Sequence, residues 1–117
     1  MSILKTAKSI CDGLNIPVMA GEYMPPTGED APLVYVVLTP ILDELVMFAD
    51  DVPHAEIQSV RIALFTKTNY TKTRKAIRDA LLLAGVTITD MRFIELERDT
   101  GYYHYAIDAE SIVKMEE

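Results

Sequence analysis

The sequence predicts a single α+β domain, residues 1–117, with a mainly antiparallel sheet of about five strands and two helices packed on one face of it. Three observations lead to this prediction. The chain has the length of one domain, and half of its 117 residues are hydrophobic, as in ordinary globular proteins. Two segments have the apolar spacing of amphipathic helices. The remaining segments are extended and joined by short connections, which favour antiparallel pairing because a parallel pair needs a long crossover.

The first predicted helix covers residues 2–14. Its apolar residues recur at the spacing of one helical face: Ile3, Leu4, Ala7, Ile10, Cys11 and Leu14. Ser2 suits the N-cap, and Gly13 with the later Pro17 marks the end. Cys11 is the only cysteine, so an internal disulfide and a Cys-rich metal site are excluded. We expect it to be a small buried residue.

The segment 19–32 contains three prolines and two glycines and is predicted to be an extended loop or arm without a core of its own. Two interpretations of it stay open. It is either a surface loop or an arm that offers Tyr23 and Met24 to a neighbouring molecule, because exposed aromatic residues and methionines are enriched at interfaces.

The next segments predict strands at 33–38 and 45–49, separated by a turn at 39–44. Pro40 belongs in this turn or on a sheet edge, because it cannot donate to a ladder. After an acidic turn that contains Asp50 and Asp51, a third strand is expected at 56–66. Its buried face is expected to consist of Val60, Ile62 and Leu64.

The second helix is expected at 70–84, with Tyr70, Ile77, Ala80, Leu81 and Ala84 on one face. Gly85 then suits the left-handed position after a helix. Two more strands are predicted at 87–97 and 102–108, joined by a turn at 99–101. The apolar face of the first switches within the strand, which predicts a bulge or strong twist.

The motifs of common enzyme classes are missing from the sequence, so we expect no catalytic residue, no cofactor and no metal. It contains no phosphate-binding glycine loop, and its two histidines have no metal-ligand spacing. His104 is interpreted as an ordinary strand residue. Asp50 and Asp51 offer oxygen ligands to a divalent cation, but two neighbouring aspartates in a turn are more often simply solvated.

Charge is distributed unevenly along the chain. The net charge is −7, yet five of the eleven basic residues lie within twelve positions and form what we call the basic cluster: Lys67, Lys72, Arg74, Lys75 and Arg78. The simple interpretation is a solvated helix face. Because the rest of the chain is so acidic, we favour a different interpretation: the basic cluster of one copy contacts an acidic surface of the next, and the copies assemble head to tail. Nucleic acid is the competing partner, but only Tyr70 is interleaved with the basic residues. No apolar run has the length of a membrane span, so no membrane partner is expected.

The run "VYVVLTPILDELVMFADDVPHAEIQSVRIALFTKTNY", the following helix that ends in "AG" and the hairpin "GYYHYAID" carry a resemblance to a known family. Over residues 33–108 the sequence resembles the tail terminator proteins (tail-completion or head–tail joining proteins) of long-tailed bacteriophages and prophages of Gram-positive bacteria. The resemblance implies a homohexameric ring that caps the tail tube, ends its polymerisation and joins the tail to the neck of the DNA-filled head. It implies as partners the tail tube protein and a head-completion or neck protein, and as locations the host cytoplasm during assembly and then the virion.

The resemblance also implies that genomic DNA passes through the ring without sequence-specific binding, which suits an acidic, phosphate-repelling chain. Asp50 and Asp51 would then be one pole of the contacts between subunits or partners, and the basic cluster would be the other. Two alternatives stay open. The first is another neck or tail component of similar fold, such as an adaptor, a stopper or an assembly chaperone. The second is a bacterial small-ligand binding module or small enzyme with Tyr102, Tyr103 and His104 in its pocket.

Overall fold

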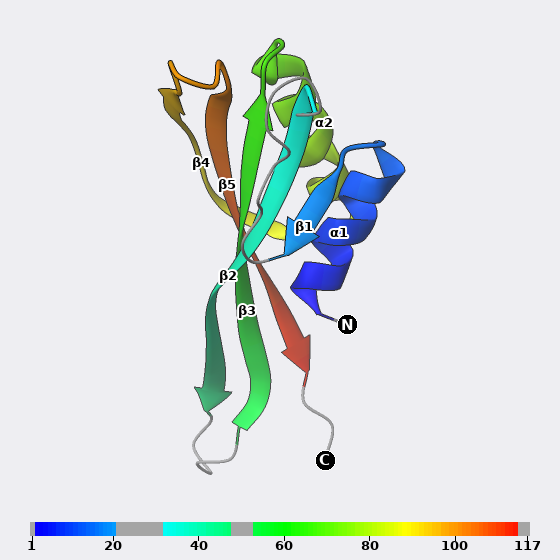
Figure 1. The fold of residues 1–117 in the computed structure, drawn as a ribbon. Helices are drawn as coiled ribbons and strands as arrows, with labels where there is room; N and C mark the ends of the chain where they lie inside the picture. Colours follow the sequence, from blue (N-terminus) through cyan, green and yellow to red (C-terminus); the bar gives the residue numbers. More distant parts are fainter. Residues whose placement is uncertain (1, 21–31, 48–52, 115–117) are drawn as a thin grey trace.

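A computed structural model of the chain describes residues 2–20, 32–47 and 53–114. Along the chain it contains α1 (Ile3–Gly13), β1 (Val18–Ala20), β2 (Val34–Met47), β3 (Pro53–Thr66), α2 (Tyr70–Leu83), β4 (Thr87–Leu96) and β5 (Tyr103–Lys114). The strands form one sheet in the order β1-β2-β3-β5-β4. All neighbouring strands are antiparallel except β1 and β2, which run parallel. The predicted α+β domain with two helices against a mostly antiparallel five-stranded sheet is confirmed (Figure 1).

The core lies between the two helices and one face of the sheet. Alternate residues of the three central strands point to this face and are buried: Val36, Leu38, Val60, Ile62, Leu64, Tyr105, Ile107 and Ala109. The helices cover them with Ile3, Ala7 and Cys11 of α1 and with Ile77 and Leu81 of α2. Each fully buried aliphatic side chain contributes about 1.5–3 kcal/mol to the free energy of unfolding. The predicted buried face of β3 and the predicted burial of Cys11 are confirmed.

The helix ends follow the capping residues of the sequence. Ser2 is the N-cap of α1, and its side chain accepts a hydrogen bond from the amide of Lys5. Gln58 on β3 accepts another from the amide of Ile3 at 3.0 Å, which fixes the start of α1 to the sheet. Asn69 caps α2 in the same way, through the amide of Thr71 at 2.9 Å. After α2, Gly85 has a φ of 80°, as predicted for the left-handed position.

The prediction of two separate strands at 33–38 and 45–49 is wrong, because they form one continuous strand, β2. We expected a turn at 39–44, but β2 continues through it, and Pro40 lies opposite Val60 of β3. β1 pairs only with Val36–Leu38, so Pro40 lies where β2 forms the edge of the sheet and a missing N–H is tolerated. The register shifts directly after Pro40, between Pro40 and Leu42.

Other predicted boundaries also move. Met19 and Ala20, which we assigned to the loop or arm, belong to β1, and residues 21–31 lie outside the described part of the chain. β3 begins three residues earlier than predicted, and β5 continues six residues further, to Lys114. The predicted bulge in β4 is confirmed by a register shift between Phe93 and Glu95.

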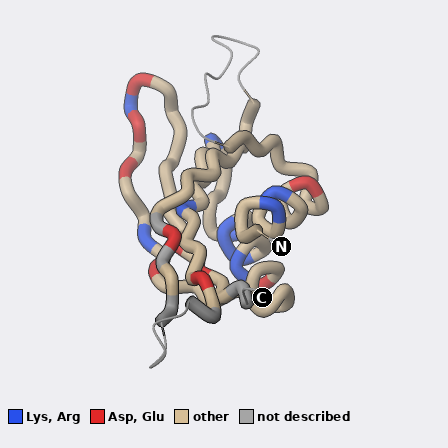
Figure 2. Tube along the Cα trace, turned by 90° about the horizontal axis from the view of Figure 1, so that it is seen from below, with Lys and Arg blue, Asp and Glu red and all other residues tan. Residues whose placement is uncertain are grey.

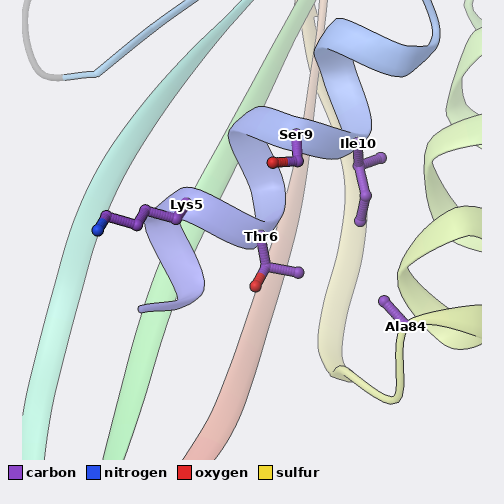
Figure 3. A pocket seen from close by; sticks show the side chains of 5 residues that line it. All are labelled: Lys5, Thr6, Ser9, Ile10 and Ala84. Carbon is purple, nitrogen blue, oxygen red and sulfur yellow. The ribbon is translucent and has the colours of Figure 1, made fainter. Parts of the chain in front are cut away.

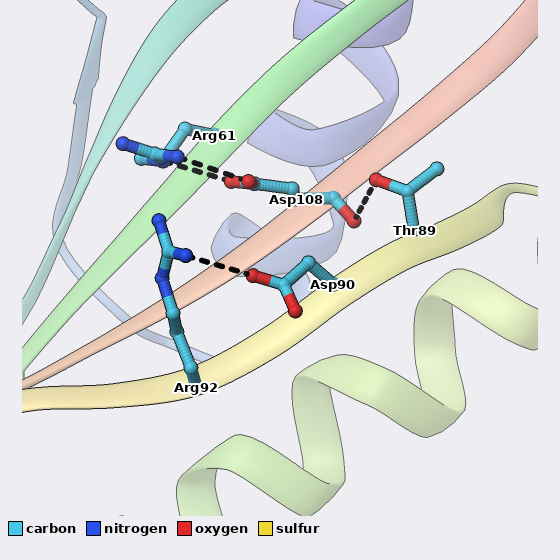
Figure 4. A network of polar contacts seen from close by, with 5 residues as sticks. All are labelled: Arg61, Thr89, Asp90, Arg92 and Asp108. Atoms are coloured by element: carbon cyan, nitrogen blue, oxygen red, sulfur yellow. Dashed lines mark hydrogen bonds and ion pairs between the residues drawn. The ribbon is translucent and has the colours of Figure 1, made fainter.

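The outer face of the sheet, which the helices leave uncovered, has aromatic and ionic contacts of its own. The rings of Tyr35 and Phe65 stack at 4.8 Å, and Phe65 stacks on His104 at 4.3 Å. The hydroxyl of Tyr102 donates a hydrogen bond to the carbonyl of Pro32. Further along the same face, Arg61 and Asp108 form an ion pair beside that of Arg92 and Asp90 (Figure 4).

Neither α1 nor α2 has the length and apolar character that a membrane-crossing helix requires, and these are the helices within the described residues.

Candidate functional site: two oppositely charged surfaces

The outer side of the two helices is a positively charged surface, which we call the helical layer. Between Ile3 and Gly13, and between Tyr70 and Leu83, the sequence has six Lys or Arg residues and two Asp residues. Figure 2 shows Lys and Arg along these helices. In a chain with a net charge of −7, this layer is a local reversal of sign. It therefore attracts acidic surfaces that the rest of the molecule repels.

The structure divides the predicted basic cluster. Lys72 and Lys75 are exposed on α2, and within the described residues neither forms an ion pair. Arg78 is paired with the adjacent Asp79 at 3.0 Å, and the guanidinium of Arg74 lies over the ring of Tyr105. Lys67 does not join them, because its ammonium lies 4.8 Å from the ring centre of Tyr102, among the aromatic rings of the outer face. Four of the five predicted residues thus share α2.

Two shallow grooves run between α1 and α2. One, of about 490 Å³, is lined by Lys5, Thr6, Ser9, Ile10 and Ala84. Figure 3 shows Thr6 and Ile10 on the side of α1 that faces Ala84, directly after α2. The other groove, of about 370 Å³, lies at the opposite end of the helix pair and is lined by seven residues: Leu14, Asn15, Ile16, Val34, Lys72, Thr73 and Ala76. Both grooves combine an apolar lining with one lysine.

Large apolar side chains are exposed beside these grooves. Leu83 is 91 % exposed and Leu82 is 56 % exposed at the end of α2, next to Ala84. The run Leu81–Leu83 indicates such exposure in the sequence. Three consecutive leucines cannot all point to the core, because only one face of a helix does. Leu81 takes that position and is fully buried. Leu82 and Leu83 were not among the residues predicted to form an interface.

The second surface belongs to the far half of the β2–β3 hairpin, which we call the distal hairpin (residues 40–47 and 53–60). From Pro40 to Val60 the sequence has five Asp or Glu residues and no Lys or Arg, and three of the five, Asp43, Glu44 and Glu56, belong to the distal hairpin. Asp43 is exposed and Glu56 is half-buried. Ile41 and Leu45 are about half exposed.

The distal hairpin contacts its own helices only at the start of α1, where Gln58 holds the amide of Ile3, and its far end continues away from them (Figure 1). The strands β2, β3 and β5 continue beyond the start of α1, and the molecule is 56 Å long but only 25 and 23 Å across (Figure 1). The far end of the hairpin is therefore not covered by the helices of its own molecule (Figure 1). Of the predicted interface residues, Asp50, Asp51, Tyr23 and Met24 lie outside the described residues.

The described residues give no support to nucleophilic chemistry at Cys11. The thiol is fully buried beneath α1, and this burial, with the nearby charge of Asp12, raises the pKa of Cys11 to about 11. The thiol therefore stays protonated at neutral pH, whereas the reactive form of cysteine is the thiolate.

The sequence matches no protein-family model, and no curated protein is significantly similar to it.

Proposed function

We propose that this protein is a structural component that assembles head to tail, with the distal hairpin of one copy docked on the helical layer of the next. The observation that carries the proposal is the separation of charge along the chain. Five acidic residues and no basic one lie between Pro40 and Val60, while the two helices have a surplus of four basic residues. Opposite potentials on different surfaces of one molecule favour contacts between its copies.

Apolar contacts support the same arrangement. The distal hairpin exposes Ile41 and Leu45, and the helical layer exposes Leu82 and Leu83 beside a groove with an apolar lining. Burying such side chains in a contact supplies about 25 cal/mol for each Å² of apolar surface, while the charges set orientation and partner choice. The two surfaces are different, so the contact is heterologous and gives a ring when the rotation between copies closes.

The function that fits such a ring, given the resemblance of residues 33–108, is that of a phage tail terminator. In this function a homohexameric ring caps the tail tube, stops its growth and joins the tail to the neck of the head. The overall negative charge suits a ring through which DNA slides, because an acidic lumen does not bind phosphates. The protonated, buried thiol of Cys11 is consistent with a structural rather than a catalytic protein.

Light scattering after size-exclusion chromatography tests the assembly, with the double variant Lys72→Glu/Lys75→Glu as the probe. Both lysines are exposed and unpaired within the described residues, so their reversal leaves the fold intact. We expect wild-type protein to form rings that dissociate between 0.1 M and 1 M salt, since the screening length falls from about 10 Å to about 3 Å. The variant is expected to remain monomeric.

The matched control is Arg92→Glu/Arg98→Glu, which lowers the net charge equally but lies on the β4–β5 hairpin. It should assemble like wild type. Rescue provides the sharper test: Asp43→Lys/Glu56→Lys mixed with the Lys72→Glu/Lys75→Glu variant should restore hetero-oligomers. A wild-type protein that stays monomeric at every concentration, or a mixture without rescue, contradicts the proposed assembly.

The tail function has a separate readout, the length of tail tubes. In phage particles that lack this protein, tubes should be overlong, and addition of the wild-type ring should stop tube growth in vitro. Free tails of normal length would instead indicate an adaptor or another neck component. The assembly contact could then still hold while the terminator function fails.

A further inference from the structure

The turn-proximal end of the β4–β5 hairpin brings together two carboxylates and an imidazole. One ligand atom from each of Glu95, Glu97 and His104 lies within 4.8 Å of the other two. The sequence alone does not group them, because His104 is seven residues from Glu97 across the hairpin turn. The register of the hairpin does, since Glu95 is the direct cross-strand partner of His104.

The bulge in β4 is what aims Glu95 at His104. Phe93 lies opposite Tyr105, and after the register shift Glu95 lies opposite His104. Tyr105 points to the helices and His104 to the outer face, so the extra residue, Ile94, moves the strand from one face to the other. Without it, Phe93 and Glu95 would share a face, and the carboxylate would not reach the imidazole.

The other two ligands are also held in place. The ring of His104 stacks on Phe65 at a centroid distance of 4.3 Å and an interplanar angle of 20°. Glu97 lies at the start of a closed turn, in which its carbonyl accepts a hydrogen bond from the amide of Gly101, and its side chain accepts one from the hydroxyl of Thr100. Gly101 permits this turn because its φ is 81°.

The charges of the group are not compensated from within the described residues. The ion pairs there involve other carboxylates, those of Asp12, Asp79, Asp90 and Asp108. The guanidinium of Arg61 is the positive charge that influences His104, and it is already hydrogen-bonded to both carboxylate oxygens of Asp108. The ring nitrogens of His104 form no hydrogen bond with described residues.

We propose that Glu95, Glu97 and His104 form a binding site for a divalent transition-metal ion, with Zn²⁺ as the best fit. Two carboxylate oxygens and one imidazole nitrogen are ordinary Zn²⁺ ligands, and tetrahedral coordination places such atoms about 3.5 Å apart. Small side-chain rotations reach this spacing from the separations in the structure. The imidazole disfavours Mg²⁺ and Ca²⁺, which take oxygen ligands. Water or a partner's side chain completes the shell.

The bound ion ties the end of the edge strand β4 to β5. Such a clamp fixes the turn of the hairpin on the outer face of the sheet, opposite the helices and at the other end of the sheet from the distal hairpin (Figure 1). The inference is therefore independent of the proposed assembly, and either can fail without the other.

Isothermal titration of the metal-free, full-length protein with Zn²⁺ tests the site. We expect one ion per chain, and at a hundredfold excess over the dissociation constant a rise in Tm of roughly 10 °C. Glu95→Gln and His104→Gln should each weaken binding at least about tenfold, because each removes one of three ligands. Glu95 is exposed, so its variant folds even if the loss of the stack on Phe65 destabilises His104→Gln.

Two control variants distinguish coordination of Zn²⁺ by the three ligands from general electrostatic attraction of the cation to the acidic hairpin. Asp99→Asn removes a neighbouring charge of the same hairpin outside the ligand set, and His54→Gln removes the other histidine. Both should bind Zn²⁺ within about twofold of wild type. The proposal is overturned if wild type binds no Zn²⁺ stoichiometrically, if Asp99→Asn weakens binding as much as Glu95→Gln, or if His104→Gln binds as wild type does. It is also overturned if Mg²⁺ competes equally.

Discussion

Arg61 on β3 binds both carboxylate oxygens of Asp108 on β5, with Nε and Nη2 as donors at 2.8 and 3.0 Å. The two residues are cross-strand partners on the outer face of the sheet, and Asp108 in turn raises the pKa of Arg61, chiefly through this hydrogen bond. On the other side of β5, the carbonyl of Asp108 accepts a hydrogen bond from the hydroxyl of Thr89 on β4 (Figure 4). Asp108 thus connects three strands where the helices give no cover.

This geometry predicts that Arg61→Lys is not a conservative substitution. A lysine keeps the charge but cannot offer two parallel donors, so we expect the free energy of unfolding to fall by about 1 kcal/mol. The pair is partly exposed, with side-chain exposures of 41 % and 15 %, which limits the loss. Urea denaturation of Arg61→Lys, Asp108→Asn and the double variant measures the coupling. Strictly additive losses would show that the two side chains do not interact.

A second prediction concerns the neighbouring leucines of α2. Leu81→Ala should lower the free energy of unfolding by about 2–5 kcal/mol, because Leu81 is fully buried and its truncation leaves a cavity. Leu83→Ser should change it by less than about 0.5 kcal/mol, since the side chain is 91 % exposed. If Leu83 belongs to the assembly surface, its variant weakens self-association while its urea midpoint stays unchanged. A loss of stability in both variants would place Leu83 in the core as well.

A third prediction follows from the burial of Cys11. The native thiol should resist alkylation by iodoacetamide at pH 8, because it is inaccessible and its pKa is raised to about 11. The rate should rise to that of a free thiol after denaturation in guanidinium, which serves as the control. Fast modification of folded protein would show that α1 opens readily from the sheet. The raised pKa also means that the stability contributed by the protonated thiol is fully present below about pH 9, where the unfolded chain begins to ionise, and is lost as the pH rises from there through about 11.

The sequence predicted the parts of the fold that rest on periodicity and capping. Both helices were found from their apolar stripes, with Ser2 and Gly85 at their ends, and the buried face of β3 was found from its alternation. The prediction of β2 was wrong at Pro40, because a strand can include a proline wherever no neighbouring strand requires a hydrogen bond from that backbone nitrogen. Only the tertiary structure shows that β1 stops pairing at Leu38 and leaves Pro40 on an edge.

The candidate sites were harder to predict from the sequence, because they also depend on tertiary structure. The basic residues of α2 were visible as a cluster, but the position of Lys67 on the opposite side of the sheet depends on the turn after β3. The apolar face change in β4 indicated a bulge, and this expectation was correct. That the bulge sets Glu95 beside His104 depends on the register of β4 with β5, for which local sequence holds no signal.

A fourth prediction concerns the response of stability to acid. Burial lowers the pKa of His104 in the folded protein, and the nearby charge of Arg61 acts in the same direction, while Glu97 and Glu95 oppose it. The unfolded chain, with a histidine pKa of about 6.5, therefore binds the proton first as the pH falls. Stability from this residue is fully present above about pH 6.5 and is lost as the pH drops towards the lower folded pKa.

The measurement is the free energy of unfolding of wild type and of His104→Gln from about pH 7 to pH 5, in metal-free buffer. Because a single group exchanges at most one proton, the wild-type curve should fall more steeply than the variant's by up to about 1.4 kcal/mol per pH unit. His54 is present in both proteins and cancels in the difference. A wild-type curve less steep than that of the variant would mean that Glu95 and Glu97 outweigh burial, so that the folded protein holds the imidazolium. Zinc would then have to displace a proton from His104, and its affinity would fall steeply with pH from neutrality downward rather than only in the acid range.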